Sequence, residues 1–395
     1  MAGMVIIGAG ECGVRAAFAL RKHGFSGPVT VIGEENALPY ERPPLSKGWM
    51  AEPKVIRKEE AYTEADIDLR LGTRVNAIDI DGKRLRLKDG DSVGYDHLLI
   101  ATGARARRFP GMEDCLTLRT DGDAGRIMQR IRSGSRVGII GGGFIGLELA
   151  ATARQAGAEV TVIEAGPRIL GRAVPEQIAR IVHARHAAEG VDVRTGTADA
   201  AADANTIKLT DGTDLDFDVV IAGVGAVPNT ILAEAGGLQV ENGIRVDRTF
   251  RTSAPTVFAA GDCCNFPWRG QRVRLESWKA AQDQGAHAAG AMLGESAEYA
   301  SVPWFWADQY DLTLQVAGLF KPGWETRERA ASTETKLIFQ CDEAGRLAAA
   351  AGIGPGNSVA KDIRLFEKLI ERGTPLEPAR LADPSINLKS LLKAA

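Results

Sequence analysis

Cysteine is scarce in this sequence: there are five among 395 residues, and none has the CxxC spacing of a zinc or redox site. An odd number of cysteines without that spacing argues against both a disulfide framework and a zinc centre. We therefore predict no metal site, and we interpret the thiols as buried groups in a reducing cytoplasm. The five are Cys12, Cys115, Cys263, Cys264 and Cys341.

A long apolar run and an excess of positive charge are also missing. No stretch approaches the roughly 18 apolar residues that a membrane-spanning helix needs, and the formal net charge is −3. We therefore expect neither a membrane span nor binding to nucleic acid. The apolar start of the chain lacks a basic segment and is interrupted by glycine, so we interpret it as a strand and not as a signal peptide.

Glycine, by contrast, is abundant, with 45 residues, and it occurs twice in the same arrangement. The first copy has an apolar strand at Met4–Ile7, then Gly8-x-Gly10-x-x-Gly13, then an apolar pattern of helical period. In a dinucleotide-binding unit the first glycine makes a tight turn. The second lets the pyrophosphate approach the backbone, and the third lets the helix pack on the strand. Glu34 follows the next strand, where a carboxylate can bind a ribose hydroxyl.

The second copy repeats this plan with a strand at Val137–Ile140, the turn Gly141-x-Gly143-x-x-Gly146, and Glu164 after the next strand. A carboxylate at that position would repel the 2′-phosphate of NADPH, so Glu164 predicts a preference for NADH. The alternative is that Glu164 is an ordinary solvated acid. Two such units in one chain predict two dinucleotides.

Five further motifs accompany the glycine turns. They are LPYERPPLSK at Leu38–Lys47, ATG at Ala101–Gly103, AAGD at Ala259–Asp262, PWFWADQYDL at Pro303–Leu312, and LADPSINLKSLL near the C-terminus. Over essentially the whole chain the sequence resembles the two-dinucleotide flavoproteins. More closely, it resembles the NADH-dependent ferredoxin reductases of Rieske-type ring-hydroxylating dioxygenases and bacterial cytochromes P450, which are putidaredoxin reductase-like.

The resemblance implies an α/β fold of glutathione reductase type, with two Rossmann-like domains and a small α+β C-terminal interface domain. Residues 1–110 and 239–302 would form a discontinuous FAD-binding domain. Residues 111–238 would form the NADH-binding domain and residues 303–395 the interface domain. In that last domain we predict strands at the alternating segments Thr335–Gln340 and Leu347–Ile353, and a helix at the amphipathic segment Val359–Arg372.

The resemblance also implies that the first glycine turn binds FAD. Arg42 would flank the adenine, the backbone of Val75 would meet it, and Asp262 would bind the ribityl chain. Trp278 would lie near the flavin ring, with ordinary helix packing as the alternative. The residues assigned to FAD are Gly8, Gly10, Gly13, Glu34, Arg42, Lys47, Val75, Ala101, Thr102, Gly103, Arg119, Gly261, Asp262 and Trp278.

The second glycine turn would bind NADH. Lys47, beside the flavin, and Glu148, near the nicotinamide, would form an ion pair; the alternative is two unrelated solvated charges. We therefore predict Lys47, Glu148 and Trp306 as catalytic residues. The residues assigned to NADH are Gly141, Gly143, Gly146, Glu148, Glu164, Arg172, Gly223 and Gly225.

Many relatives in the wider superfamily pass electrons through a CxxxxC pair beside the flavin, after the second strand. Here the corresponding segment, PYERPPLSKGW at Pro39–Trp49, contains no cysteine. Without a thiol relay, reduced flavin must hand its electrons directly to an external acceptor. We therefore predict hydride transfer from NADH to FAD, followed by single-electron transfer to a [2Fe–2S] ferredoxin that feeds a terminal oxygenase.

The route by which electrons leave stays open at this stage. Trp304 and Trp306 share one face of a strand. They could line the flavin and the ferredoxin-docking surface, with Trp306 the better candidate, or belong to the core. Arg105, Arg107 and Arg108 could steer an acidic ferredoxin or be a solvated charge run. The alternative functions are a rubredoxin or quinone-type acceptor reductase, and a slowly turning NADH-sensing protein like apoptosis-inducing factor.

Overall fold

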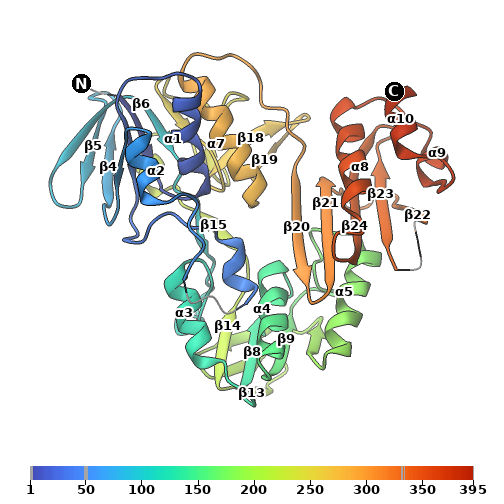
Figure 1. Ribbon diagram of the computed structural model, residues 1–395. Helices are drawn as coiled ribbons and strands as arrows, with labels where there is room; N and C mark the ends of the chain where they lie inside the picture. Colours follow the sequence, from blue (N-terminus) through green and yellow to red (C-terminus); the bar gives the residue numbers. More distant parts are fainter. Residues whose placement is uncertain (1–2, 49–51, 331, 333, 395) are drawn as a thin grey trace. The chain divides into compact units, whose positions relative to one another are not determined.

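The chain divides into two compact units, each assembled from segments that are distant in sequence (Figure 1). The structure is a computed structural model, and it describes residues 3–48, 52–330, 332 and 334–394. Unit 1 comprises Met1–Arg42, Ala51–Arg105 and Ala226–Ser301, and unit 2 comprises Pro43–Met50, Ala106–Gly225 and Val302–Ala395. The three-domain division at residues 110, 238 and 302 stays a prediction.

Unit 1 is built on a sheet with the strand order β3-β2-β1-β6-β5-β4, in which β17 also pairs with β6. The strands β1, β2, β3, β6 and β17 run parallel, whereas β4 and β5 are antiparallel additions. Every residue of β1 and β2 is buried, which explains their continuous apolar sequences. The bounds are β1 (Gly3–Ile7), β2 (Val29–Ile32), β3 (Ile67–Arg70), β4 (Val75–Asp79), β5 (Arg84–Leu87), β6 (Ser92–Ile100) and β17 (Val257–Ala259).

Helices α1 (Glu11–Lys22) and α7 (Trp278–Met292) lie side by side on this sheet (Figure 1). They approach closely because α7 is rich in small residues: a Cβ atom at Gly285 would lie 2.3 Å from the carbonyl oxygen of Cys12. The other elements of this part of the chain are α2 (Glu59–Glu64), β7 (Ala104–Ala106), which pairs with β15 (Ala226–Pro228), α6 (Ile231–Ala235), and the sheet of β16 (Ile244–Arg245), β18 (Cys264–Trp268) and β19 (Gln271–Val273).

Unit 2 contains a second parallel sheet, with the order β10-β9-β8-β14. An antiparallel sheet of β11, β12 and β13 follows β10 in the chain. The bounds are η1 (Pro43–Ser46), α3 (Asp121–Arg130), β8 (Arg136–Ile140), α4 (Phe144–Gln155), β9 (Glu159–Glu164), α5 (Glu176–Ala188), β10 (Asp192–Thr195), β11 (Asp199–Ala202), β12 (Thr206–Leu209), β13 (Asp214–Asp216) and β14 (Val219–Ala222).

The C-terminal part of unit 2 is an antiparallel sheet, β20-β21-β24-β23-β22, with helices after it. Its strands alternate between two cores. On β23, Leu337 and Phe339 pack with α8 residues, whereas Ile338 packs with Ile178 and Val182 of α5. The bounds are β20 (Trp304–Gln309), β21 (Leu312–Gly318), β22 (Arg327–Ala330), β23 (Lys336–Cys341), β24 (Leu347–Pro355), α8 (Ala360–Arg372), α9 (Pro378–Ala382) and α10 (Leu388–Ala394).

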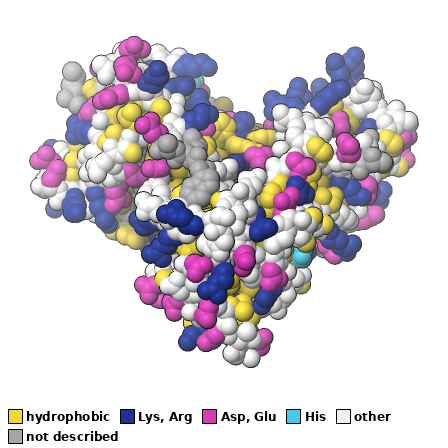
Figure 2. All heavy atoms as spheres, turned by 60° about the horizontal axis from the view of Figure 1, so that its bottom comes forward, with side chains coloured by type: hydrophobic (Ala, Val, Ile, Leu, Met, Phe, Trp, Pro, Cys, Tyr) yellow, Lys and Arg dark blue, Asp and Glu magenta, His cyan; other side chains and the backbone are white. Residues whose placement is uncertain are grey.

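The surface mixes charges of both signs. On the face shown in Figure 2, Lys and Arg side chains are interspersed with Asp and Glu side chains, which fits the small net charge of −3. Among the residues that the structure describes, no helix is both long and apolar enough to cross a bilayer.

Candidate functional site

The first glycine turn lies between β1 and α1, and its three glycines have different surroundings. Gly8 has a φ of +110°, and a Cβ atom there would lie 2.1 Å from the carbonyl oxygen of Ala101. A Cβ atom at Gly13 would lie 1.9 Å from the carbonyl oxygen of Gly8, so this glycine is needed for close packing. A Cβ atom at Gly10 would meet no protein atom within 4 Å. The open side of Gly10 therefore fits a ligand that approaches the backbone.

The second glycine turn, between β8 and α4, repeats this geometry. Gly141 has a φ of +104°, and a Cβ atom there would lie 2.5 Å from the carbonyl oxygen of Gly223. A Cβ atom at Gly146 would lie 2.2 Å from the carbonyl oxygen of Gly141, whereas one at Gly143 would meet nothing within 4 Å. Gly10 and Gly143 are the N-caps of α1 and α4, and neither helix has a side-chain cap. Both helix starts can thus offer backbone N–H groups to a pyrophosphate, so the residues fit a dinucleotide at each turn.

The other motifs predicted to bind FAD in unit 1 gather at the first turn. The segment Ala101–Gly103 passes beside Gly8 and is fixed by Asn229, whose backbone N–H donates to the Gly103 carbonyl at 2.9 Å. A Cβ atom at Gly261 would lie 3.1 Å from Cβ of Cys12, so the Gly-Asp motif also borders this turn. Backbone packing therefore brings three sequence-distant motifs together.

Two carboxylates follow β2, and sequence analysis named only one of them. Glu34 is exposed and lies 3.4 Å from Nη1 of Arg74. Glu35 is half-buried; it accepts a hydrogen bond of 2.7 Å from Arg42 and another from the hydroxyl of Tyr40. The predicted ligand Arg42 is thus held by Glu35.

The carboxylate of Glu164 is fixed against the second glycine turn. Its Oε2 accepts a hydrogen bond of 2.8 Å from the backbone N–H of Gly142, and Oε1 accepts one of 2.7 Å from Gly166. Glu164 is therefore not a freely solvated acid, and its negative charge stands beside the turn predicted to bind NADH.

The predicted catalytic residues of unit 2 form one cluster. Lys47 follows η1, and its Nζ lies 3.6 Å from Oε1 of Glu148 on α4. The same ammonium lies 2.6 Å from Oδ2 of Asp308 and 4.9 Å from the ring centre of Trp306, both on β20. Lys47 and Glu148 are thus partners and not unrelated solvated charges.

Helix α4 holds this cluster through two side chains one turn apart, on one face of the helix. The hydroxyl of Ser46 donates to Glu148, and the hydroxyl of Thr152 donates to the Ser46 carbonyl at 2.7 Å. These bonds fix η1, and with it the start of the Lys47 side chain, on α4.

Burial raises the pKa of Glu148 above its usual value, and the negative charge of Asp308 adds to this rise. Lys47 and the hydrogen bond from Ser46 act in the opposite direction and lower it. Glu148 is 8% exposed, so its charged form depends on these partners. The cluster can therefore hold a proton on Glu148 at a higher pH than an ordinary glutamate can.

The aromatic residues have different environments. Trp304 and Trp306 stack with their ring centres 5.6 Å apart, and Trp304 packs against the C-terminal core whereas Trp306 faces Lys47. Trp278, at the start of α7, donates a hydrogen bond of 3.1 Å from Nε1 to Glu11, the first residue of α1. Trp306 is therefore the tryptophan of β20 that contacts Lys47.

The other predicted residues lie on different elements of the two units. Val75 is buried on β4, Arg172 is exposed in the segment between β9 and α5, and Arg119 precedes α3 in unit 2. Gly225 has a φ of +105°. Arg105 and Arg108 bind neighbouring backbone or side-chain oxygens within their own units, which favours a local structural role over steering.

All five cysteines are free thiols. Cys12, Cys263 and Cys264 are buried, and burial raises the pKa of each above its usual value. Burial also raises the pKa of the Cys341 thiol to about 11. Because the thiolate is the reactive form, none of these groups is suited to relay electrons. Among the described residues, no group of three or more potential metal ligands occurs.

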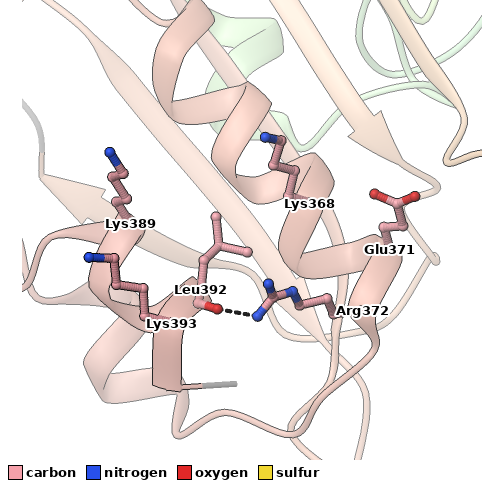
Figure 3. Close-up of a pocket in the computed structure, with 6 residues that line it drawn as sticks. All are labelled: Lys368, Glu371, Arg372, Lys389, Leu392 and Lys393. Atoms are coloured by element: carbon pink, nitrogen blue, oxygen red, sulfur yellow. Dashed lines mark hydrogen bonds between the residues drawn. The ribbon is translucent and has the colours of Figure 1, made fainter.

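A cavity of about 470 Å³ lies elsewhere, between α8 and α10 (Figure 3). Arg372 donates to the backbone carbonyl of Leu392 across it. No residue predicted to bind a cofactor or to act in catalysis lines this cavity. Its lining residues are Lys368, Glu371, Arg372, Lys389, Leu392 and Lys393.

Comparison with known proteins agrees with the geometry. Residues 3–285 match the family model described as pyridine nucleotide-disulphide oxidoreductase, and residues 304–392 match the model described as reductase C-terminal. The chain belongs to the pyridine nucleotide-disulphide oxidoreductase family. The fold class and the family predicted from the sequence are confirmed.

Individual relatives match along nearly the full length. The ferredoxin–NAD(+) reductase component of the anthranilate 1,2-dioxygenase system of Burkholderia cepacia is 42% identical, over 98% of each chain. Putidaredoxin reductase of Pseudomonas putida is 34% identical, over 99% of this chain and 97% of the relative. A crystal structure of the covalent putidaredoxin reductase–putidaredoxin complex matches with a TM-score of 0.93 and 34% identity, covering 100% of this chain and 99% of that one.

Proposed function

We propose that the protein is an NADH-dependent, FAD-containing ferredoxin reductase that supplies single electrons to a [2Fe–2S] ferredoxin serving a Rieske dioxygenase or a cytochrome P450. The observation that carries this proposal is the pair of glycine turns, each with one glycine open to a ligand, in a chain whose five cysteines form no disulfide and of which only Cys341 is partly exposed. The names of relatives that are 42% and 34% identical along the chain support it.

The first turn is assigned to FAD and the second to NADH. In the first, the open side of Gly10 and the start of α1 would receive the pyrophosphate, with Ala101–Gly103 and Asp262 beside it. In the second, Gly143 and α4 would do the same, and Gly223 borders the turn. The anchored carboxylate of Glu164 disfavours a 2′-phosphate and so favours NADH.

FAD, when bound, accepts one hydride, which carries two electrons, and can release these electrons one at a time. For this chemistry the ammonium of Lys47 would stabilise negative charge that develops on the flavin. Glu148 would compensate Lys47 and orient the nicotinamide, and it can hold a proton because burial raises its pKa. Trp306 covers Lys47 and is the proposed exit point for electrons.

We place this activity in the cytoplasm, where NADH is available and thiols stay reduced. The five free cysteines support this placement, because a chain in an oxidising compartment would be expected to pair such residues.

An electron-acceptor panel tests the proposal. The purified protein should be yellow, and NADH should drive rapid reduction of ferricyanide. Adding a [2Fe–2S] ferredoxin should accelerate cytochrome c reduction. A protein that cannot be loaded with FAD, or whose flavin NADH does not reduce, would overturn the assignment.

The same panel separates the alternative functions. A rubredoxin or quinone acceptor reductase would turn over faster with those acceptors than with any [2Fe–2S] ferredoxin. A sensor protein would form a long-lived complex with NADH and turn over slowly with every acceptor.

A further inference from the structure

The Lys47 ammonium has two carboxylate partners, and the proposed function uses only the more distant one. Nζ lies 2.6 Å from Oδ2 of Asp308 but 3.6 Å from Oε1 of Glu148. The shorter contact is a charge-assisted hydrogen bond, whereas the longer one is an ion pair beyond hydrogen-bond distance. Asp308 is thus the principal counter-ion of Lys47.

Asp308 is itself held in place. It pairs with Thr313 across β20 and β21, and the Thr313 hydroxyl donates a hydrogen bond of 3.0 Å to Oδ1. This leaves Oδ2 directed at Lys47. The negative charge of Asp308 meanwhile raises the pKa of Glu148. One residue of β20 therefore acts on both members of the Lys47–Glu148 pair.

The three groups form an unbalanced charge cluster, because two carboxylates share one ammonium. The Glu148 side chain is 9% exposed and that of Asp308 is 40% exposed, so solvent stabilises the charge of Asp308 more. Besides these three, the hydroxyl of Ser46 on η1 also acts on Glu148. The excess negative charge is relieved most readily when Glu148 takes up a proton.

We propose that Asp308 is a positioning residue for the reductase reaction: it anchors the Lys47 ammonium beside Glu148, and its negative charge acts on both members of that pair. This inference rests on the proposed function, because Lys47 and Glu148 act on the cofactors only if that function is correct. It adds a residue on the C-terminal sheet to the determinants of flavin reduction.

Asp308→Asn tests the proposal in the FAD-loaded protein, because it removes the charge and nearly keeps the shape. Removing a like charge should make Glu148 release its proton more easily. The midpoint of Glu148 titration, followed by carboxylate ¹³C NMR with Glu148→Gln for assignment, should move to lower pH. The pH profile of flavin reduction by NADH should move in the same direction. The midpoint potential of the flavin should become more positive, because the Lys47 ammonium, which acts on the flavin in the proposed function, loses its principal counter-ion.

Two further variants serve as controls. Asp311→Asn makes the same chemical change three residues further on, at an exposed residue that pairs with Arg185, and should shift none of the three readouts. Asp308→Glu keeps the charge and should restore most of the wild-type behaviour.

If Asp308→Asn and Asp311→Asn give the same titration, profile and potential, Asp308 only supports the sheet and the proposal is wrong. Should Asp308→Asn fail to fold, Thr313→Val releases the Asp308 carboxylate without changing charge. It should give a smaller shift in the same direction, and no shift would equally overturn the proposal. A wild-type flavin that NADH does not reduce would instead contradict the proposed function.

Discussion

At the scale of single residues, each glycine turn contains two kinds of glycine. Some are required for the chain to fold, and one leaves room for a ligand. Alanine at Gly13 or Gly146 would place Cβ about 2 Å from a backbone oxygen, which no local shift can accommodate. Gly10 and Gly143 have φ values of −82° and −83° with extended ψ, which alanine adopts easily, and their outer sides are open. The sequence alone shows three equivalent glycines in each turn, so this distinction comes only from the structure.

We therefore expect Gly10→Ala and Gly143→Ala to fold normally and to lose different ligands. Gly10→Ala should be purified with at least about tenfold less FAD, because its methyl group occupies the approach of the pyrophosphate. Gly143→Ala should remain yellow but raise KM for NADH by about tenfold or more. Flavin content, NADH kinetics and thermal stability of the cofactor-free proteins measure these effects. The opposite pattern of losses would reverse the assignment of the two turns.

Glu164 allows a test of coenzyme choice at a single residue. Glu164→Arg should shift the ratio of kcat/KM for NADH over NADPH toward NADPH by about tenfold or more, because a cation replaces a charge that repels the 2′-phosphate. Glu164→Gln is the matched control: it keeps a hydrogen-bond acceptor for Gly142 and should weaken the preference without reversing it. An unchanged ratio in both variants would remove Glu164 from the specificity determinants.

At the scale of elements, the sequence predicts helix α8 and strand β24 well, because their apolar periods are regular and both faces of the C-terminal sheet are covered. The starts of α1 and α4 are less well predicted. Apolar periodicity suggests Val14 and Leu147, whereas the helices begin at Glu11 and Phe144, directly after the open glycine. The first turn of each helix serves the ligand site, so its residues do not follow the packing pattern.

The predicted contacts between elements differ in how far the sequence reveals them. The Lys47–Glu148 pair comes from the family resemblance, whereas nothing in the sequence indicates the Lys47–Asp308 contact between residues 261 positions apart. The alternation in PWFW places Trp304 and Trp306 on one face, but only tertiary structure shows that Trp304 meets the core and Trp306 meets Lys47. Local patterns predict which side chains share a face and leave their distant neighbours undetermined.

Helix α5 is attached to the end of β20 by a buried polar contact that is sensitive to pH. Nε2 of His186 lies 2.9 Å from Oε1 of Gln309, and burial lowers the pKa of His186 despite this bond. In the unfolded chain His186 takes up a proton near pH 6.5, whereas in the folded chain it does so only at lower pH. The contribution of neutral His186 to the free energy of unfolding is therefore present above about pH 6.5. It is lost as the pH falls further.

His186→Gln should therefore make the free energy of unfolding fall less steeply as the pH decreases below neutral. Between pH 7 and pH 5 the wild type should lose about 1 kcal/mol more of its free energy of unfolding than the variant does. Urea denaturation at several pH values measures the difference. His183→Gln, on the same helix but only half-buried, is the comparison; because His183 is only a minor cause of the lowered pKa of His186, this variant should stay closer to the wild type than His186→Gln does. If the free energy of unfolding depends on pH in the same way in the wild type and in His186→Gln, His186 does not govern the loss of stability at acid pH.

At the scale of the whole molecule, electrons must enter from NADH and leave to a protein that carries them singly. The chain offers no thiol pair for this exit, and its net charge of −3 gives no general attraction for an acidic partner. The exit therefore depends on a local structure. Trp306 is the aromatic side chain on β20 whose ring lies 4.9 Å from the Lys47 ammonium, and it is partly exposed.

Trp306→Ala should lower the ferredoxin-dependent rate by about tenfold and the ferricyanide rate by no more than about twofold. Lys47 should stay in place, because its contact with Asp308 remains and an exposed cation–π contact contributes only about 0.5–1 kcal/mol. Trp306→Phe keeps an aromatic ring at the position and should recover part of the ferredoxin-dependent rate. The measurement is the ratio of the two rates under saturating NADH. Equal losses with both acceptors would mean that Trp306 supports the Lys47 cluster, and that electrons leave the molecule at another point.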